Sequence, residues 1–240
     1  IKEAIRQYGD PGILAIKKEL DQMISKEVWT PVHRKDLDAD QINKIIPSLI
    51  FLKQKYKPDG SPDKVKARLV AGGHRQDESL YSDTSSPTVE ITNIFMECTL
   101  AAAAKKAIAT ADIGSAYLNA DLDTQIHMKL DREVAEVLVR YYPQYAAFVD
   151  ENGFIIVELK KSLYGCKQSA LQWYNHMKKT LQAMGYTPNI YDQCVFEGVD
   201  GSTILLYVDD LMIFANSDDE LLSIIGLEYH WRTNHREYLQ

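Results

Sequence analysis

The sequence has 240 residues, of which 45% are hydrophobic and 25% charged, and its formal net charge is −7. This composition excludes a disordered or collagen-like chain, and the length allows one large domain or two small ones. No run of 18 uncharged apolar residues occurs and the first residues are charged, so we expect neither a membrane segment nor a secretory signal.

The first third of the chain combines an amphipathic helix with a pair of strands. Apolar residues at helical spacing predict a helix over 13–24. Residues with high β propensity predict strands over 44–56 and 65–70. The turn signal Pro58-Asp59-Gly60-Ser61 joins these strands into an antiparallel pair with a basic rim.

The remaining elements are interspersed without a regular period. Helices are predicted over 90–106, 131–140 and 169–184, the last beginning at Ser169 and capped by Gly185. Strands are predicted over 107–113, 126–130, 154–159, 194–197, 203–207 and 211–215. Because βαβ alternation is absent, the sequence favours an α+β fold with an antiparallel sheet over a doubly wound parallel sheet.

Charge and cysteine content differ along the chain. Residues 1–75 carry 15 basic and 10 acidic side chains, whereas residues 76–240 carry 12 and 24. A basic part that contacts a polyanion and an acidic part that binds metal ions would give this pattern, and an unevenly solvated surface explains it equally well. The cysteines Cys98, Cys166 and Cys194 have no paired spacing, which favours free thiols in a reducing compartment.

Two adjacent aspartates, Asp209 and Asp210, lie between two apolar runs. An unpaired carboxylate at such a junction is costly to desolvate, so a cation is expected beside it. Neighbouring strand residues point to opposite faces, so both aspartates serve one site only if they lie on a tight hairpin turn. Taken alone, Tyr207-Val-Asp-Asp210 is equally consistent with an exposed acidic turn.

A third aspartate, Asp112, ends another apolar strand far upstream of this pair. Three carboxylates converging from two strands would repel one another unless divalent cations lay between them. Hard oxygen ligands select Mg²⁺ or Mn²⁺, and two such ions about 3.5–4 Å apart activate a 3′ hydroxyl and stabilise leaving pyrophosphate. The pattern therefore predicts phosphoryl transfer.

Several segments occur together in the order and approximate spacing of a known family. Asp112-Ile-Gly-Ser-Ala-Tyr-Leu, Lys161-Ser-Leu-Tyr-Gly-Cys-Lys-Gln-Ser-Ala-Leu-Gln-Trp-Tyr174 and Tyr207-Val-Asp-Asp210 resemble the reverse transcriptase of Ty1/copia-type LTR retrotransposons. Lys66-Ala-Arg-Leu-Val-Ala-Gly-Gly73 and Glu27-Val-Trp29 extend the resemblance to nearly the whole chain. It implies a right-hand polymerase fold, α+β, with fingers and an N-terminal extension over 1–106 and an antiparallel palm sheet within 107–240.

The resemblance also assigns roles to individual residues. It implies Asp112, Asp209 and Asp210 as catalytic residues that, with the backbone carbonyl of Ile113, bind two Mg²⁺ ions, or Mn²⁺ in their place. The implied nucleotide-binding residues are Lys66, Arg68, Tyr117, Tyr164, Gly165 and Gln168, and the implied nucleic-acid contacts are Lys167, Gly226 and Glu228.

Four of these nucleotide-binding roles have a physical reason. Lys66 and Arg68 would neutralise triphosphate charge, for which a plain surface cation is the structural alternative. Tyr117 would fill the space of a 2′-hydroxyl, for which a core tyrosine is the alternative. Gly165 would let the backbone approach the ligand closely. We expect Trp173, by contrast, to pack its helix rather than to stack on a base.

The end of the sequence departs from the family pattern. After Asp210 the family continues through a palm helix, a strand with a basic residue and a primer-grip hairpin. Here only residues 216–224 precede Ile225-Gly-Leu-Glu-Tyr229, which resembles that hairpin, so the palm is shortened after residue 216. No lysine follows Lys179, and no candidate therefore exists for a lysine that protonates pyrophosphate.

The resemblance implies an RNA-directed DNA polymerase that extends a primer with dNTPs on an RNA or DNA template. The implied partners are the RNase H and integrase portions of a polyprotein and a second copy of the chain, with no membrane. The implied location is a cytoplasmic virus-like particle, with the nucleus as a second compartment. The alternative is a catalytically inactive nucleic-acid-binding or assembly module descended from a polymerase, which the shortened palm favours and the intact aspartates disfavour.

Overall fold

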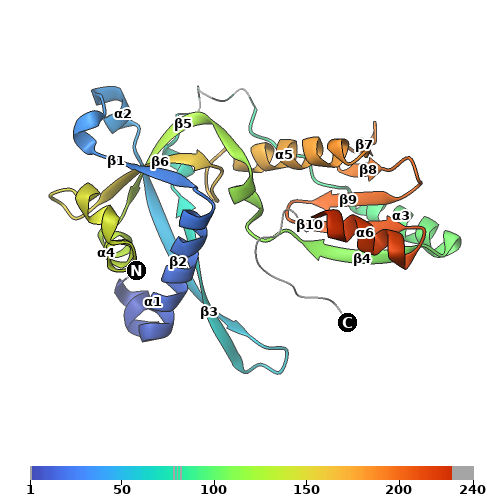
Figure 1. Ribbon diagram of the computed structural model, residues 1–240, viewed down its shortest axis with the longest axis horizontal. Helices are drawn as coiled ribbons and strands as arrows, with labels where there is room; N and C mark the ends of the chain where they lie inside the picture. Colours follow the sequence, from blue (N-terminus) through green and yellow to red (C-terminus); the bar gives the residue numbers. More distant parts are fainter. Residues whose placement is uncertain (1, 78, 80, 82, 229–240) are drawn as a thin grey trace. The chain divides into compact units, whose positions relative to one another are not determined.

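The computed structural model describes residues 2–77, 79, 81 and 83–228. The chain forms two compact units, each assembled from two stretches of sequence. Unit 1 comprises Ile1–Thr84 and Tyr117–Ser169, and unit 2 comprises Ser85–Ala116 and Ala170–Gln240. Each unit contains one five-stranded sheet together with helices, which confirms the α+β class (Figure 1).

The predicted division at 106–107 differs from these units. That position lies inside unit 2, and residues 117–169 return to unit 1. The helix that precedes position 106 joins unit 2 because Asp192 accepts hydrogen bonds from the backbone N–H of Glu90 and the side-chain amide of Asn93, at 3.0 and 2.7 Å.

The sheet of unit 1 has the strand order β1-β6-β5-β2-β3. All its neighbours pair antiparallel except β2 and β5, which pair in parallel through Ile46 and Pro47. The strands are β1 (Trp29–Val32), β2 (Ile46–Tyr56), β3 (Pro62–Ala71), β5 (Asp121–Leu130) and β6 (Ile155–Lys161). The parallel pair and β1 were not predicted from the sequence.

Three helices belong to unit 1, namely α1 (Lys2–Ser25), α2 (Ala39–Asn43) and α4 (Arg132–Tyr141). Helix α1 is interrupted at Gly9, whose φ of +57° is left-handed, and its second segment contacts β3 and α4. The buried side chains Ile16, Leu20 and Met23 follow the predicted helical spacing and join Leu69 of β3 in the core.

The sheet of unit 2 has the order β4-β10-β9-β8-β7 and is antiparallel throughout, as predicted. Its strands are β4 (Ala107–Asp112), β7 (Thr187–Pro188), β8 (Val195–Glu197), β9 (Thr203–Tyr207) and β10 (Asp210–Ala215), and its helices are α3 (Ile91–Ala104), α5 (Ser169–Ala183) and α6 (Asp218–Glu228). Trp173, Phe196 and Phe214 fill its core. Gly185 ends α5 with a φ of +94°, which confirms the predicted cap.

Helix α6 occupies the place where the sequence predicted the start of a primer-grip hairpin. Gly226 and Glu228 lie in the last turn of this helix, so the hairpin prediction is wrong up to residue 228, and residues 229–240 lie outside the described residues. The helix forms because three acidic residues occupy its first turn, where they complement the helix dipole. Leu221 and Ile224 are buried at helical spacing.

Two further observations concern the polarity of the helices and the state of the cysteines. Within the described part of the chain, every helix is too short or too polar to cross a bilayer. All three cysteines are free thiols, as predicted, and burial raises the pKa of both Cys166 and Cys194 to about 12.

Candidate active site

The strand ends in unit 2 bring Asp112 and Asp210 together. Asp112 is the last residue of β4, Asp210 is the first residue of β10, and the two are register partners in the antiparallel ladder. Directly paired residues place their side chains on the same face of a sheet, with Cβ atoms about 4.5–5.5 Å apart. Two of the three predicted catalytic carboxylates therefore lie at the exposed end of this strand pair, here called the β4–β10 edge.

Asp209 lies on a two-residue turn that joins β9 to β10. Tyr207 and Asp210 pair across this turn, leaving Val208 and Asp209 at its centre. Val208 has a φ of +56° whereas Asp209 does not have a positive φ, which is the pattern of a type II′ turn. A β-branched residue in this conformation is strained, at a cost on the order of 1–3 kcal/mol. The predicted tight hairpin turn is thus present.

Both central carbonyls of the turn accept hydrogen bonds from buried residues. The indole Nε1–H of Trp173 donates to the carbonyl oxygen of Val208 at 2.5 Å, and the backbone N–H of Ile113 donates to the carbonyl oxygen of Asp209 at 2.8 Å. These bonds attach the turn to α5 and to the residue that follows Asp112. The backbone that carries all three aspartates is therefore linked directly.

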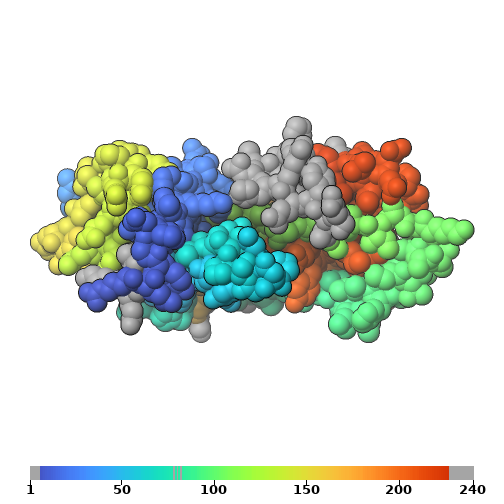
Figure 2. All heavy atoms as spheres, turned by 90° about the horizontal axis from the view of Figure 1, so that it is seen from below, coloured from blue at the N-terminus to red at the C-terminus, as the bar shows by residue number. Residues whose placement is uncertain are grey.

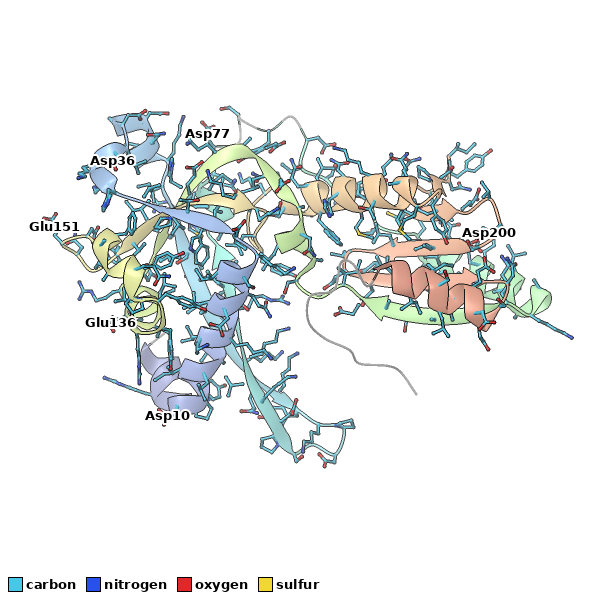
Figure 3. All side chains as sticks on the ribbon, in the orientation of Figure 1. Asp10, Asp36, Asp77, Glu136, Glu151 and Asp200 are labelled. Carbon is cyan, nitrogen blue, oxygen red and sulfur yellow. The ribbon has the colours of Figure 1, made fainter. Side chains whose placement is uncertain are left out.

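The aspartates interact electrostatically. The pKa of Asp210 is raised by partial burial and, to a smaller extent, by the negative charges of Asp209 and Asp112. Asp200, labelled in Figure 3 at the turn between β8 and β9, shows the opposite effect. The backbone N–H and the hydroxyl of Ser202 donate to its carboxylate at 2.9 and 2.6 Å and lower its pKa. An unfavourable concentration of negative charge thus marks the β4–β10 edge.

The donor chemistry of this edge suits a hard divalent cation. Among the described residues, no group of three or more His, Cys, Asp or Glu side chains is arranged closely enough to hold a metal ion. The carboxylates of Asp112 and Asp210 nevertheless lie on paired residues, and their mutual repulsion is what a bound cation would relieve. Oxygen ligands of this kind fit Mg²⁺ or Mn²⁺.

Three of the predicted nucleotide-binding side chains, Arg68, Tyr117 and Tyr164, form a cluster in unit 1, called the stack below. The guanidinium of Arg68 on β3 lies 4.3 Å from the centroid of the Tyr164 ring. The ring of Tyr164 in turn lies 4.5 Å from that of Tyr117, at an interplanar angle of 41°. Lys66 is exposed two residues before Arg68 on the same face of β3. The structure therefore brings together residues that are up to 96 positions apart.

Gly165 was predicted to let the backbone approach a ligand closely, and in the structure it lets two backbone segments of the chain approach each other. Gly165 has a φ of +92°, and a Cβ atom there would lie 2.1 Å from the carbonyl oxygen of Ala71. A Cβ atom on Gly73 would likewise lie 1.9 Å from the carbonyl oxygen of Gly165. The N–H of Ala71 donates to the carbonyl of Tyr164 at 2.7 Å. These glycines are needed because two backbone segments of this chain pack directly together.

Gln168, a predicted nucleotide-binding residue, makes hydrogen bonds within unit 1. Its side chain is buried, and its amide donates to the Thr124 hydroxyl at 2.9 Å and accepts from the Gln76 amide at 3.1 Å. The N–H of Lys167 donates to the Gln76 side-chain oxygen at 2.8 Å. In this structure Gln168 holds the loop in place because its polar atoms are already bonded within unit 1.

Sequence reasoning missed the contact between Trp173 and the turn. The predicted packing role of Trp173 is confirmed, since only 1% of the side chain is exposed. Its hydrogen bond to Val208 could not be found from the sequence, because the acceptor is a backbone carbonyl 35 residues away. The only available signal was an indole on the buried face of a predicted helix.

Comparison with known proteins adds independent information. A family profile described as reverse transcriptase (RNA-dependent DNA polymerase) matches residues 26–228. The chain is 32% identical over 172 residues to the Retrovirus-related Pol polyprotein from transposon RE1 of Arabidopsis thaliana, covering 70% of this chain and 11% of that protein. It is 31% identical over 225 residues to the Transposon Ty1-DR4 Gag-Pol polyprotein of Saccharomyces cerevisiae, covering 90% of this chain and 12% of that protein. The chain thus spans about a tenth of the length of these curated relatives.

Proposed function

This chain belongs to the reverse transcriptase (RNA-dependent DNA polymerase) family and is of the Ty1/copia type, and from that premise we propose that it adds dNTPs to a primer 3′ end on an RNA or DNA template. The observation that carries the proposal is the register pairing of Asp112 with Asp210 beside the turn that holds Asp209. The relatives are named as Pol and Gag-Pol polyproteins, which supports placing the chain within a longer polyprotein, and we propose RNase H and integrase as other portions of it.

The carboxylates of unit 2 form the proposed catalytic group. Asp112, Asp209, Asp210 and the backbone carbonyl of Ile113 would hold two Mg²⁺ ions. When bound, these ions would supply Lewis-acid activation of the primer hydroxyl and charge stabilisation of the pyrophosphate. The chain itself contributes a fixed backbone, because the ladder and the anchored turn hold the backbone positions of Asp112, Asp209 and Asp210. Carboxylates held in this way need little reorganisation during the reaction.

The stack in unit 1 forms the proposed nucleotide-binding group. Arg68 and Lys66 supply positive charge that neutralises the triphosphate, and Tyr164 orients the Arg68 guanidinium through ring contact. Tyr117 packs against the same ring and limits the space available beside the sugar, which favours dNTP over rNTP.

The β2–β3 hairpin supports contact with a polyanion. Its exposed face pairs Phe51 with Arg68 and Lys53 with Lys66. Like charges opposite each other in a ladder are unfavourable, so phosphate groups on this face would stabilise the arrangement. The tip of the hairpin, cyan in Figure 2, lies uncovered on the face shown there. We assign unit 1 the part of the fingers and unit 2 the part of the palm.

A second candidate function follows from α6. This helix begins three residues after β10 ends, so the described chain passes directly from the catalytic hairpin into α6. A chain in which α6 takes the place predicted for the start of the primer grip could bind primer–template without extending it. The chain would then act as a nucleic-acid-binding module.

Primer extension distinguishes the two functions. The 240-residue chain is incubated with a primed RNA template, dNTPs and Mg²⁺, alongside Asp209→Ala and Asp210→Ala variants. Extension by the wild type and its loss in both variants is the expected result, and undiminished extension by the variants would refute the assignment. Salt-dependent binding of primer–template without extension, and without stabilisation by Mg²⁺, would favour the binding module.

A further inference from the structure

We propose that Trp173 is a positioning residue for nucleotidyl transfer, which acts by holding the peptide between Val208 and Asp209 in one orientation. This inference rests on the proposed function, because it concerns the turn that carries two of the catalytic carboxylates. Trp173 lies on α5, and its indole N–H donates to the Val208 carbonyl at 2.5 Å.

The acceptor of this bond is the carbonyl of the central peptide of the turn. Type I′ and type II′ turns differ in the dihedral angles of their two central residues, and conversion between them rotates that peptide. A donor fixed on α5 therefore favours one orientation. The same peptide includes the N–H of Asp209, so the hydrogen bond from Trp173 also determines the backbone orientation at Asp209 and the direction of its side chain.

Val208 makes the turn dependent on an external donor. Its φ of +56° is disfavoured for a β-branched side chain, so the residues of the turn do not by themselves favour this backbone conformation. The next carbonyl, that of Asp209, accepts the N–H of Ile113 at 2.8 Å. Without Trp173 the ladder would still hold Asp210 beside Asp112, but the Val208 carbonyl would lose its donor and the orientation of Asp209 would no longer be fixed.

The burial of Trp173 explains why an indole is needed there. The side chain is 1% exposed, so its N–H must find a partner inside the protein. A phenylalanine would fill most of the same volume but would leave the Val208 carbonyl without this donor. The Trp173→Phe variant therefore separates packing from hydrogen bonding.

The test compares Trp173→Phe with Tyr174→Phe in the 240-residue chain. Tyr174 is the next residue on α5, is also buried, and donates to a backbone carbonyl, that of Gln193, at 3.0 Å. We expect Trp173→Phe to lower kcat about tenfold or more with KM for dNTP changed less than about twofold, because substrate contacts remain intact. Tyr174→Phe should leave both constants within about twofold of the wild type.

Rescue at Val208 tests the orientation argument. Glycine adopts positive φ without strain, so Val208→Gly in the Trp173→Phe background should restore kcat to within about threefold of the Val208→Gly single variant. A purely structural role predicts no such rescue, because glycine at the turn does not repack the space beside α5. Loss of kcat that persists equally in both backgrounds would overturn the proposal.

Hydrogen exchange and amide chemical shifts provide a readout that does not depend on activity. In the wild type, the Trp173 indole proton should exchange slowly. The Asp209 amide resonance should shift in Trp173→Phe and not in Tyr174→Phe. A wild type that fails to extend primers refutes the proposed function alone. Rapid indole exchange, an unshifted Asp209 amide, or wild-type kcat in a folded Trp173→Phe variant refutes the positioning role.

Discussion

Asp112 and Asp210 face each other across the ladder that joins β4 to β10, although they are 98 residues apart in the chain. The pairing is set by the apolar alternation of both strands and not by the aspartates, because Ala111 pairs with Leu211 and Ala109 pairs with Ile213 on the opposite face. Packing of that face in the core therefore places two like charges side by side. The fold accepts an unfavourable pair at this edge because the rest of the ladder stabilises it.

The first prediction concerns Asp210→Asn, which removes one charge and keeps the shape of the side chain. We expect the rate of primer extension to fall by about 10²–10³-fold, since charge stabilisation by bound metal is worth several kcal/mol. Asp200→Asn is the matched control, because Asp200 also lies on a hairpin turn of the same sheet. Steady-state extension assays decide the matter, and equal activity in the Asp210 and Asp200 variants would contradict the assigned role.

The second prediction concerns stability in EDTA. Because the pKa of Asp210 is raised in the folded chain, the folded state binds a proton more tightly than the unfolded state does. The free energy of unfolding therefore falls as pH rises from about 4 through the folded pKa, and the ionised carboxylate is destabilising above it. We expect Asp210→Asn to raise the free energy of unfolding by about 0.5 kcal/mol at pH 7, after allowing for solvent screening, and to give no gain at pH 3.

Urea unfolding at the two pH values measures this difference. Asp200→Asn should act in the opposite direction at pH 7, because hydrogen bonds from Ser202 lower the pKa of Asp200. Destabilisation by Asp210→Asn at pH 7 would show that the carboxylate contributes favourable interactions that outweigh its repulsion.

The third prediction tests the geometry of the Arg68 contact. Arg68→Lys keeps the positive charge but loses the planar guanidinium that lies over Tyr164. We expect kcat/KM for dNTP to fall about tenfold, mainly through KM, because a loss of 1–2 kcal/mol in cation–π and bidentate binding corresponds to that factor. Arg140→Lys is the control, since Arg140 lies 5.6 Å from the Tyr141 ring in the same unit. An unchanged KM for Arg68→Lys would indicate that charge alone suffices.

The strands and turn of the candidate active site could be predicted from local sequence. Short apolar runs identified β4, β9 and β10, and a tight hairpin turn was required for Asp209 and Asp210 to share a site. Physical rules that act between neighbours are sufficient at these positions. The same holds for Gly185, whose position after a helical pattern predicted its positive φ.

Features that depend on distant contacts could not be predicted. The compact units do not divide at 106–107, because Asp192 binds the start of α3 from nearly a hundred residues away. The buried position of Gln168 could not be predicted, because its partners, Gln76 and Thr124, are on separate segments. The hairpin expected near Gly226 was inferred from resemblance, whereas the structure has α6 there, with acidic residues in its first turn.

The fourth prediction concerns discrimination between dNTP and rNTP. Tyr117→Ala removes the ring that packs against Tyr164, and we expect the preference of kcat/KM for dNTP over rNTP to fall about 10–100-fold. Tyr117→Phe should retain the preference, because the volume of the ring and not its hydroxyl excludes the 2′-hydroxyl. Extension assays with each nucleotide measure the ratio. An equal loss of preference in both variants would instead implicate the hydroxyl.

The fifth prediction compares two glycines with the same backbone conformation. Gly165 and Gly185 have φ values of +92° and +94°, so replacement by alanine strains the backbone about equally at both positions. A Cβ atom at Gly165 would also collide with the carbonyl oxygen of Ala71 at 2.1 Å, whereas Gly185 has no neighbouring atom within 4 Å. We expect Gly185→Ala to cost about 1 kcal/mol of unfolding free energy and Gly165→Ala about 3 kcal/mol or more, measured by urea unfolding. The Ala71 backbone cannot move aside without breaking the Ala71–Tyr164 hydrogen bond, so the collision at Gly165 is costly. Similar costs at the two sites would contradict the packing of the Gly165 loop against the end of β3.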